Sequence, residues 1–271
     1  MRAETIVTIA FLVSFSAAWA DETTWRFHMQ SANSAYQRGD YRAAIAQLEA
    51  ALKETEEFSP EDPRLATTVN NLAVLYAAHG QYARAEPLYK LLLAISEKAL
   101  GPEHPDVAIC LNNLAGLYRR QGQYAEAEPL IMRSLAIRER VHGPEHPDVA
   151  TSLNNLARLY SEQGHHTQAE PLYKRSLAMA EKTLGPEHPN VATSLDNLAR
   201  HHCEQGQHHQ AEPLYKRALS IMEKAFGPEH PNMANGLEHA AKHYRETGRA
   251  KEAETLEMRA ARIRSLPRCC Q

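Results

Sequence analysis

Histidine and cysteine side chains that could bind a metal ion gather in one stretch of the sequence. Imidazole and thiolate are ligands that zinc accepts readily, so this stretch is the first candidate for chemistry. His166 and His208 are separated by 42 residues, and other motifs of the chain recur at the same spacing. No HxxxH or CxxC pattern occurs within the stretch, so a histidine-rich edge facing solvent is the favoured interpretation and we assign no metal site. The stretch comprises His165, His166, His201, His202, Cys203, His208 and His209.

The other histidines and cysteines fit structural roles. The histidines of four HP dipeptides stand at connectors where a helix is expected to begin, and no carboxylate or thiolate accompanies them. Cys110 and Cys203 belong to units two apart, and packed helices are about 8–10 Å apart, which exceeds the reach of a disulfide. Cys269 and Cys270 end the chain. In an oxidising compartment they could join two copies as a homodimer, and a frayed tail without a role is the alternative.

Motifs of enzymes are absent from the sequence. It contains no GxSxG, no phosphate-binding P-loop and no HExxH, which are the patterns that announce common catalytic sites. We therefore predict no catalytic residues, no cofactor and no enzymatic activity. Lys and Arg number 30 against 33 Asp and Glu, a formal net charge of -3. A nucleic-acid partner is not expected, because it needs a general basic field.

The N-terminus has the pattern of a secretory signal peptide. Arg2 precedes an apolar stretch over residues 6–15, and Ala18-Trp19-Ala20 forms a small-residue cleavage motif of the kind that ends such peptides. An uncleaved anchor is the alternative, but the stretch is shorter than the about 20 residues that span a bilayer. We expect cleavage after Ala20, export to a periplasm or to the exterior, and no membrane span in the mature chain.

An internal repeat of 42 residues organises the rest of the chain. The pentapeptide GPEHP recurs at 101–105, 143–147, 185–189 and 227–231, and a degenerate copy occupies 59–63. Apolar residues at helical spacing predict two helices in each unit, and a glycine at the end of each helix suits a left-handed stop. A fixed period of this length predicts a solenoid of stacked units. The predicted stops are Gly39, Gly80, Gly101, Gly122, Gly143, Gly164, Gly185, Gly206, Gly227 and Gly248.

The repeated sequence LxNLAxLYxxQGxYxxAEPLYxRxL resembles the tetratricopeptide repeat, in the 42-residue form of kinesin light chain and nephrocystin-like proteins. In one copy its anchors are Leu114, Ala115, Tyr118, Gly122 and Ala127. The resemblance implies an all-α fold, a right-handed superhelical solenoid of about six helix-turn-helix repeats. The expected organisation is a signal peptide at 1–20, an array at 21–267 with units at about 25–60, 61–101, 102–143, 144–185, 186–227 and 228–267, and a tail at 268–271.

In this family the first helices of the units line a concave groove, and the resemblance assigns several side chains to it. Paired asparagines recur in successive first helices, although asparagine is unfavourable inside a helix. Their amides could bind the backbone of an extended peptide, or one of each pair could bond to the adjacent unit and fix the stacking. The predicted groove residues are Asn70, Asn71, Asn112, Asn113, Arg119, Asn154, Asn155, Arg158, Asn197, Arg200 and Lys242.

Positive side chains in this groove predict the charge of the partner. Arg158, Arg200 and Lys242 follow one another at the repeat spacing. We expect a protein-protein interaction scaffold that binds an extended, acidic segment, as in kinesin light chain, whose groove takes acidic peptides with an aromatic anchor. The alternative function is a structural scaffold that self-associates through its ends or its terminal cysteines. The acids that could instead pair with Arg200 and Arg245 and neutralise the strip are Asp196, Glu204, Glu238 and Glu246.

Overall fold

The computed structural model describes residues 22–55, 58–59 and 62–266, and these residues form helices and connectors without a strand. They divide into two compact units, one up to Pro102 (unit 1) and one from Glu103 to Leu266 (unit 2). None of the described helices is both long and apolar enough to cross a membrane. The predicted signal peptide at 1–20, and the tail with Cys269 and Cys270, lie outside the described residues.

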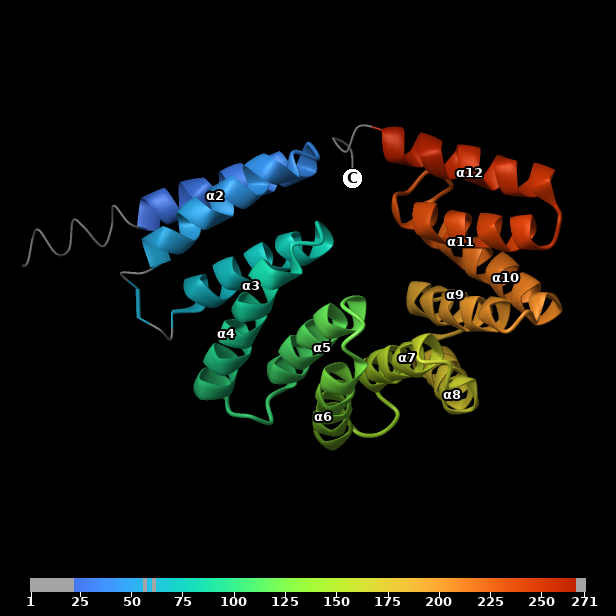
Figure 1. Cartoon of the computed structure of the whole chain (residues 1–271), viewed down its shortest axis with the longest axis horizontal. Coiled ribbons are helices and arrows are strands. Elements are labelled where there is room, and N and C mark those ends of the chain that lie inside the picture. The colour runs from blue at the N-terminus through green and yellow to red at the C-terminus, as the bar shows by residue number, and fades with distance from the viewer. Residues whose placement is uncertain (1–21, 56–57, 60–61, 267–271) are drawn as a thin grey trace, which may run out of the picture. The chain divides into compact units, whose positions relative to one another are not determined.

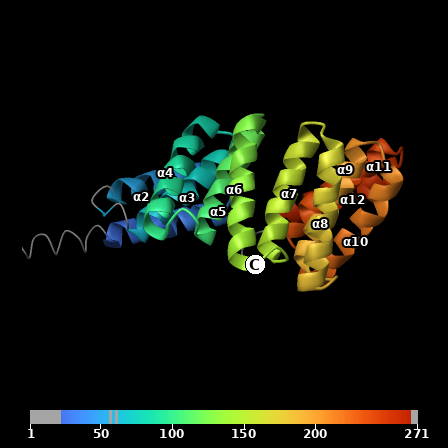
Figure 2. The same ribbon diagram turned by 90° about the horizontal axis from the view of Figure 1, so that it is seen from below.

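Each unit is a stack of helix-turn-helix pairs (Figures 1 and 2). In unit 1, the helix at residues 22–37 is followed by α2 (Tyr41–Glu54), α3 (Pro63–Ala78) and α4 (Tyr82–Leu100). In unit 2 every helix packs against the next one along the chain, and α5, α7, α9 and α11 also contact one another in that order. We call the surface of these four the first-helix face. The helices of unit 2 are α5 (Pro105–Arg120), α6 (Tyr124–His142), α7 (Pro147–Glu162), α8 (His166–Leu184), α9 (Pro189–Glu204), α10 (His208–Phe226), α11 (Asn232–Glu246) and α12 (Ala250–Ser265).

The histidines of the GPEHP motifs start the first helices. Nδ1 of His104 accepts the backbone N–H of Asp106 at 3.2 Å, and His146, His188 and His230 bond to the second residue after them in the same way. An imidazole nitrogen thus takes the place of the Ser or Asp oxygen that usually caps a helix. The interpretation of the motif as a helix-starting connector is confirmed.

The predicted glycine stops are confirmed by their backbone angles. All ten have positive φ, for example 73° at Gly122 and 86° at Gly143. Gly143 N–H donates to the carbonyl of Glu139 at 2.9 Å and so satisfies one of the last carbonyls of α6. A residue with a Cβ adopts this conformation at a cost, which explains why the repeat keeps glycine there.

Small and polar residues hold the helices of unit 2 together. Ala127, Ala169 and Ala211 are fully buried in the second helices of their pairs, so the backbones approach closely. Ser134 Oγ donates to the carbonyl of Ala108 at 2.8 Å, which ties α6 to α5. Arg138 Nη1 donates to the carbonyl of Asp148 at 2.8 Å, which ties α6 to the following α7. Burial lowers the pKa of Arg138, partly offset by the nearby Asp148 carboxylate.

Candidate functional site

Two adjoining cavities open on the first-helix face of unit 2. Each has a volume of about 420 Å³, and both are bordered by Arg158, Arg200, Tyr215 and His239. The first, which we call the basic cavity, is lined by Arg119, Arg158, Glu162, Arg200, Cys203, Glu204, Tyr215, His239, Lys242, His243 and Glu246. The second, which we call the mixed cavity, adds amides and apolar side chains, among them Asn190, Asn197, Leu219, Met222, Phe226, Asn232, Met233 and Asn235.

Three arginines share one carboxylate in the basic cavity. Glu162 forms an ion pair with Arg119 and lies 3.7 Å from Nε of Arg158. Arg200 has no ion pair with any described residue. Burial lowers the pKa of Arg158 to about 10, and repulsion from Arg119 and Arg200 acts in the same direction. With Lys242, four basic side chains line the cavity against three carboxylates, Glu162, Glu204 and Glu246, so the lining carries an excess of positive charge.

The Arg158 side chain is also short of hydrogen bonds. Its Nε is buried and has no hydrogen-bond partner among the described residues. A buried donor without a partner costs about 1–3 kcal/mol, and the penalty is larger for a charged group. The Arg158 guanidinium therefore has hydrogen-bonding capacity that no described residue fills.

Of the four acids that could neutralise the basic strip, only Glu246 forms an ion pair with a member of it, Lys242. Arg245 pairs with Glu257 and with none of those four acids, and Arg200 is left without a carboxylate partner among the described side chains. The contacts of the four acids are Asp196 with His239 at 2.8 Å, Glu204 with the hydroxyl of Ser161 at 2.6 Å, Glu238 with Arg264 at 2.7 Å and Glu246 with Lys242 at 3.7 Å.

Several of the predicted groove asparagines connect successive repeats instead of facing a cavity. The Nδ2 of Asn112 donates to Ser134 Oγ at 2.7 Å and lies 3.3 Å from Ser152 Oγ, and its Oδ1 accepts from Asn155 at 3.3 Å. Asn154 Nδ2 donates to Ser194 Oγ in the next repeat at 3.1 Å. These bonds agree with the alternative interpretation of the asparagines, in which their amides bond to the adjacent unit and fix the stacking.

Other predicted groove residues keep free hydrogen-bonding capacity. Asn154 Oδ1 is buried without a partner among the described residues. Asn197 lines the mixed cavity, and Asn113 is half-buried on α5 outside both cavities. Asn70 and Asn71 line a separate cavity of about 490 Å³ within unit 1.

The structure therefore brings Arg119, Arg158, Arg200 and Lys242 together, with Asn197 beside them. The apolar wall of the mixed cavity was not predicted from the sequence. The sequence gives one sign of this wall, an aromatic residue at a position where the preceding repeat has a leucine. Phe226 stands 42 residues after Leu184 and is 39% exposed.

The predicted solvent-facing histidine edge is wrong for two of its members. His201 and His202 are 1% and 3% exposed. Nδ1 of His201 lies 2.7 Å from Ser161 Oγ, and Nδ1 of His202 lies 2.7 Å from Gln207 Oε1. Burial is the main cause that lowers the pKa of His201, followed by the charges of neighbouring histidines. Two groups of described side chains could hold a metal ion, Cys203 with His208 and His243, and His142 with His146 and Asp148.

Comparisons with known proteins agree with the repeat architecture. The family model of the tetratricopeptide repeat matches residues 23–98, 70–131, 111–182, 166–224 and 190–265. No protein of curated function matches the sequence.

Solved structures share this architecture. The chain is similar to BtubC (BKLC) from P. vanneervenii at 26% identity and a TM-score of 0.63, over 83% of this chain and 91% of that one. It is similar to the nearly identical kinesin light chain TPR-like repeats of Podosopora anserina at 31% identity and a TM-score of 0.62, over 74% and 95%. A Rap protein complexed with the Competence and Sporulation Factor has the same fold at 14% identity and a TM-score of 0.61, over 89% and 75%.

Proposed function

Because the chain belongs to the tetratricopeptide repeat family, whose members generally mediate protein-protein interactions, we propose that it binds an extended, acidic segment of a partner protein. The binding surface is the first-helix face of unit 2. Stacked helix pairs form long surfaces suited to extended ligands, and the role is one of binding without catalysis.

The arginine cluster of the basic cavity carries this proposal. Arg119, Arg158 and Arg200 have one carboxylate among them, Glu162. A Glu or Asp of the partner would supply a second carboxylate to the three arginines, and Arg200 has no ion pair with any described residue. Charge-assisted hydrogen bonds of this kind are stronger than neutral ones, and a half-buried site is weakly screened by salt.

The mixed cavity supports a second feature of the ligand. Leu219, Met222 and Phe226 of α10 form an apolar wall within reach of the arginines, because both cavities share Arg158 and Arg200. An aromatic or large aliphatic side chain of the partner fits this wall, with Asn197 available to its backbone. The ligand chemistry is therefore an acidic segment with one apolar anchor, as in the kinesin light chain groove that the sequence resembles.

Fluorescence anisotropy with synthetic peptides tests the proposal. The probe is a short peptide rich in Glu and Asp with one tryptophan, and the control peptide has Gln and Asn in place of the acids. We expect the chain to bind the acidic peptide and Arg158→Gln/Arg200→Gln to lose about tenfold or more in affinity, as for a charge pair without its partner.

The matched control is Arg175→Gln/Arg217→Gln, which removes two arginines that pair with glutamates between second helices. It should bind the acidic peptide as the unmodified chain does, and circular dichroism verifies that both variants stay helical. Equal binding by the Arg158/Arg200 variant, or an equal loss in the control variant, would overturn the proposed site.

We further propose that the protein is exported and that cleavage after Ala20 leaves Asp21 as the first residue. The basis is the pattern of the N-terminal sequence alone. N-terminal sequencing of the protein from a fractionated cell tests the proposal. A mature chain that begins with Asp21 outside the cytoplasm supports it, and a cytoplasmic chain that retains residues 1–20 contradicts it.

A further inference from the structure

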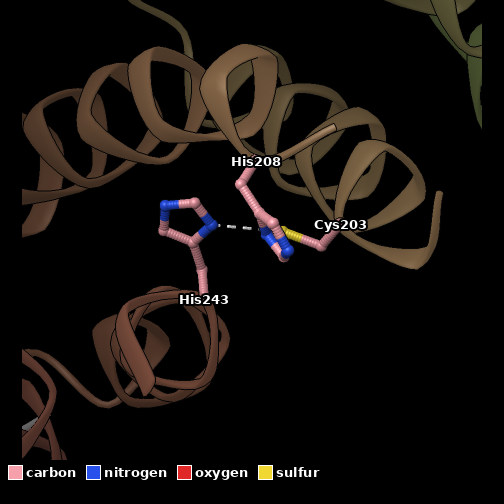
Figure 3. A group of neighbouring side chains, drawn as sticks. All are labelled: Cys203, His208 and His243. Carbon is pink, nitrogen blue, oxygen red and sulfur yellow. Dashed lines mark hydrogen bonds between the residues drawn. The ribbon is translucent and has the colours of Figure 1, made fainter. Parts of the chain in front are cut away.

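Three side chains that can ligate a metal converge from three helices of unit 2. Cys203 lies in the last turn of α9, His208 begins α10, and His243 lies in the last turn of α11. Figure 3 shows the thiol and the two imidazole rings turned toward one another. One ligand atom of each residue lies within 4.8 Å of the other two. The group joins two consecutive repeats, since α11 belongs to the repeat that follows α9 and α10.

Two ring nitrogens of this group have no hydrogen-bond partner. His208 Nδ1 and His243 Nε2 are both buried without a partner among the described residues. The His243 side chain has almost no access to water, because the residue is only 2% exposed. Native proteins rarely keep buried polar atoms unsatisfied, so His208 Nδ1 points to a ligand from outside the chain. His243 would bind the same ion through Nδ1, the ring nitrogen that lies beside Cys203.

The spacing of the group suits a tetrahedral ion. His243 Nδ1 lies 3.3 Å from Cys203 Sγ. Zinc bonds of about 2.3 Å to sulfur and 2.0 Å to nitrogen, at a tetrahedral angle, place those two atoms about 3.5 Å apart. The ring centroids of His208 and His243 are 5.5 Å apart with an interplanar angle of 50°. A rotation of the half-buried His208 about its side-chain bonds would bring its nitrogen to the same ion.

The preceding repeat contains the same arrangement with a serine in place of the cysteine. Ser161, His166 and His201 each stand 42 residues earlier, and the two rings are 5.4 Å apart at 57°. There His201 is satisfied at both nitrogens, by Ser161 Oγ at 2.7 Å and by the side chain of Gln205 at 2.8 Å. A serine hydroxyl is a poor zinc ligand compared with a thiolate. Nδ1 of the first histidine of the second helix is buried without a partner in both groups, at His166 and at His208. The group around Cys203 differs by its soft thiol ligand and by His243, whose Nε2 also has no partner among the described residues.

We propose that Cys203, His208 and His243 bind a zinc ion and leave its fourth position to solvent. One thiolate and two imidazoles are a donor set that zinc accepts. The bound ion joins α9, α10 and α11 and so stabilises the contact between two repeats. Cys203 and His243 also line the basic cavity, so the ion adds positive charge to its edge. The other group, His142 with His146 and Asp148, is mostly exposed and has no unpartnered buried nitrogen among its described atoms.

The test uses the full chain without a polyhistidine tag, with Cys269→Ser and Cys270→Ser in every variant so that the terminal thiols cannot bind metal. Co²⁺ is titrated under a phosphine reductant, and thiolate-to-cobalt charge transfer reports on the cysteine ligand. We expect one equivalent of Co²⁺ with this band, and its displacement by Zn²⁺. Zn²⁺ at a hundredfold excess over its Kd should raise the melting temperature by about 5–10 °C.

Cys203→Ser is the decisive variant, because Ser161 shows that the repeat accepts serine at this position. It should lose the charge-transfer band and bind Zn²⁺ at least tenfold more weakly, while its melting temperature without metal stays close to that of the parent. His243→Gln should lose binding, and His142→Gln should retain it. Failure of the parent to bind Co²⁺, unchanged binding by Cys203→Ser, or a loss confined to His142→Gln would each overturn the proposal.

Discussion

Ala169→Leu tests the helix-pair packing on which the repeat depends. Ala169 is 0% exposed on α8 and packs with Ala157, Tyr173 and Leu198, which are 0%, 2% and 4% exposed. The larger side chain adds three carbon atoms where neighbouring residues already fill the space. Overpacking of this kind costs about 1–3 kcal/mol. For a chain of this size, about 2 kcal/mol corresponds to a fall of roughly 4–8 °C in the melting temperature.

Thermal denaturation followed by far-UV circular dichroism measures this change. The matched control is Ala178→Leu, which places the same side chain at an exposed position of the same helix and should change stability by about 0.5 kcal/mol or less. Hydrogen exchange should accelerate in α7 and α9 as well as in α8, because repeats are stabilised by their neighbours. Equal melting temperatures of Ala169→Leu and the unmodified chain would refute the packing described above.

Three further changes test local features. Asn112→Ala should lower the free energy of unfolding in urea by about 1–3 kcal/mol, because Asn155 and two serines lose a buried partner, and an unchanged urea midpoint would contradict the stacking role. Gly116→Ala should raise the melting temperature, since an added Cβ meets nothing within 4 Å and alanine is favoured in mid-helix by about 0.5–1 kcal/mol. Gly122→Ala should lower the melting temperature, because φ is 73° at this residue. A lower melting temperature for Gly116→Ala than for Gly122→Ala would refute these assignments. Hydrogen bonds from Tyr76, and secondarily from Arg84, lower the pKa of Glu49 below the ordinary 4.5. The stabilisation that the ionised Glu49 gives to the fold is therefore complete above the unfolded-state pKa and disappears as the pH falls through the lower folded-state pKa. Glu49→Gln should melt at a lower temperature than the parent at neutral pH, and the two melting temperatures should converge in acid. A difference that persists in acid would contradict the assignment.

The repeat period explains why most of the fold could be predicted from the sequence. The ten glycines at helix ends and the HP dipeptides at the starts of α5, α7, α9 and α11 are local signals, and both act within a few residues of their position. Local signals of this kind are readable in one sequence because the repeat presents them several times over. The stacking of the pairs then follows from their shared apolar faces.

Partners of the groove side chains could not be predicted from the repeat, because they depend on contacts between units. Asn112 and Asn155 bond to one another across 43 residues, and Asn154 bonds to Ser194 across 40. The offsets differ from the period of 42 because a side chain reaches obliquely to the neighbouring helix. The basic residues could be predicted to gather, since three of them share one position in successive repeats.

The histidine prediction failed for a different reason. His201 stands at the position that Leu117 and Leu159 occupy in earlier repeats, and all three are buried. The repeat register therefore held a signal for its burial, whereas the prediction rested on the histidine-rich composition of the stretch. His243 lies outside the histidine-rich stretch, and the fold brings it to Cys203. Burial and contacts between repeats therefore decided the environment of each ring.

Photo-crosslinking of a bound peptide would locate the binding surface on the chain itself. The probe is the acidic peptide with its tryptophan replaced by a benzophenone amino acid, and mass spectrometry identifies the crosslinked residue. We predict crosslinks in the mixed cavity, at Leu219, Met222 or Phe226, and their loss in Arg158→Gln/Arg200→Gln. Crosslinks confined to α6, α8 or unit 1, unaffected by that double substitution, would contradict binding on the first-helix face.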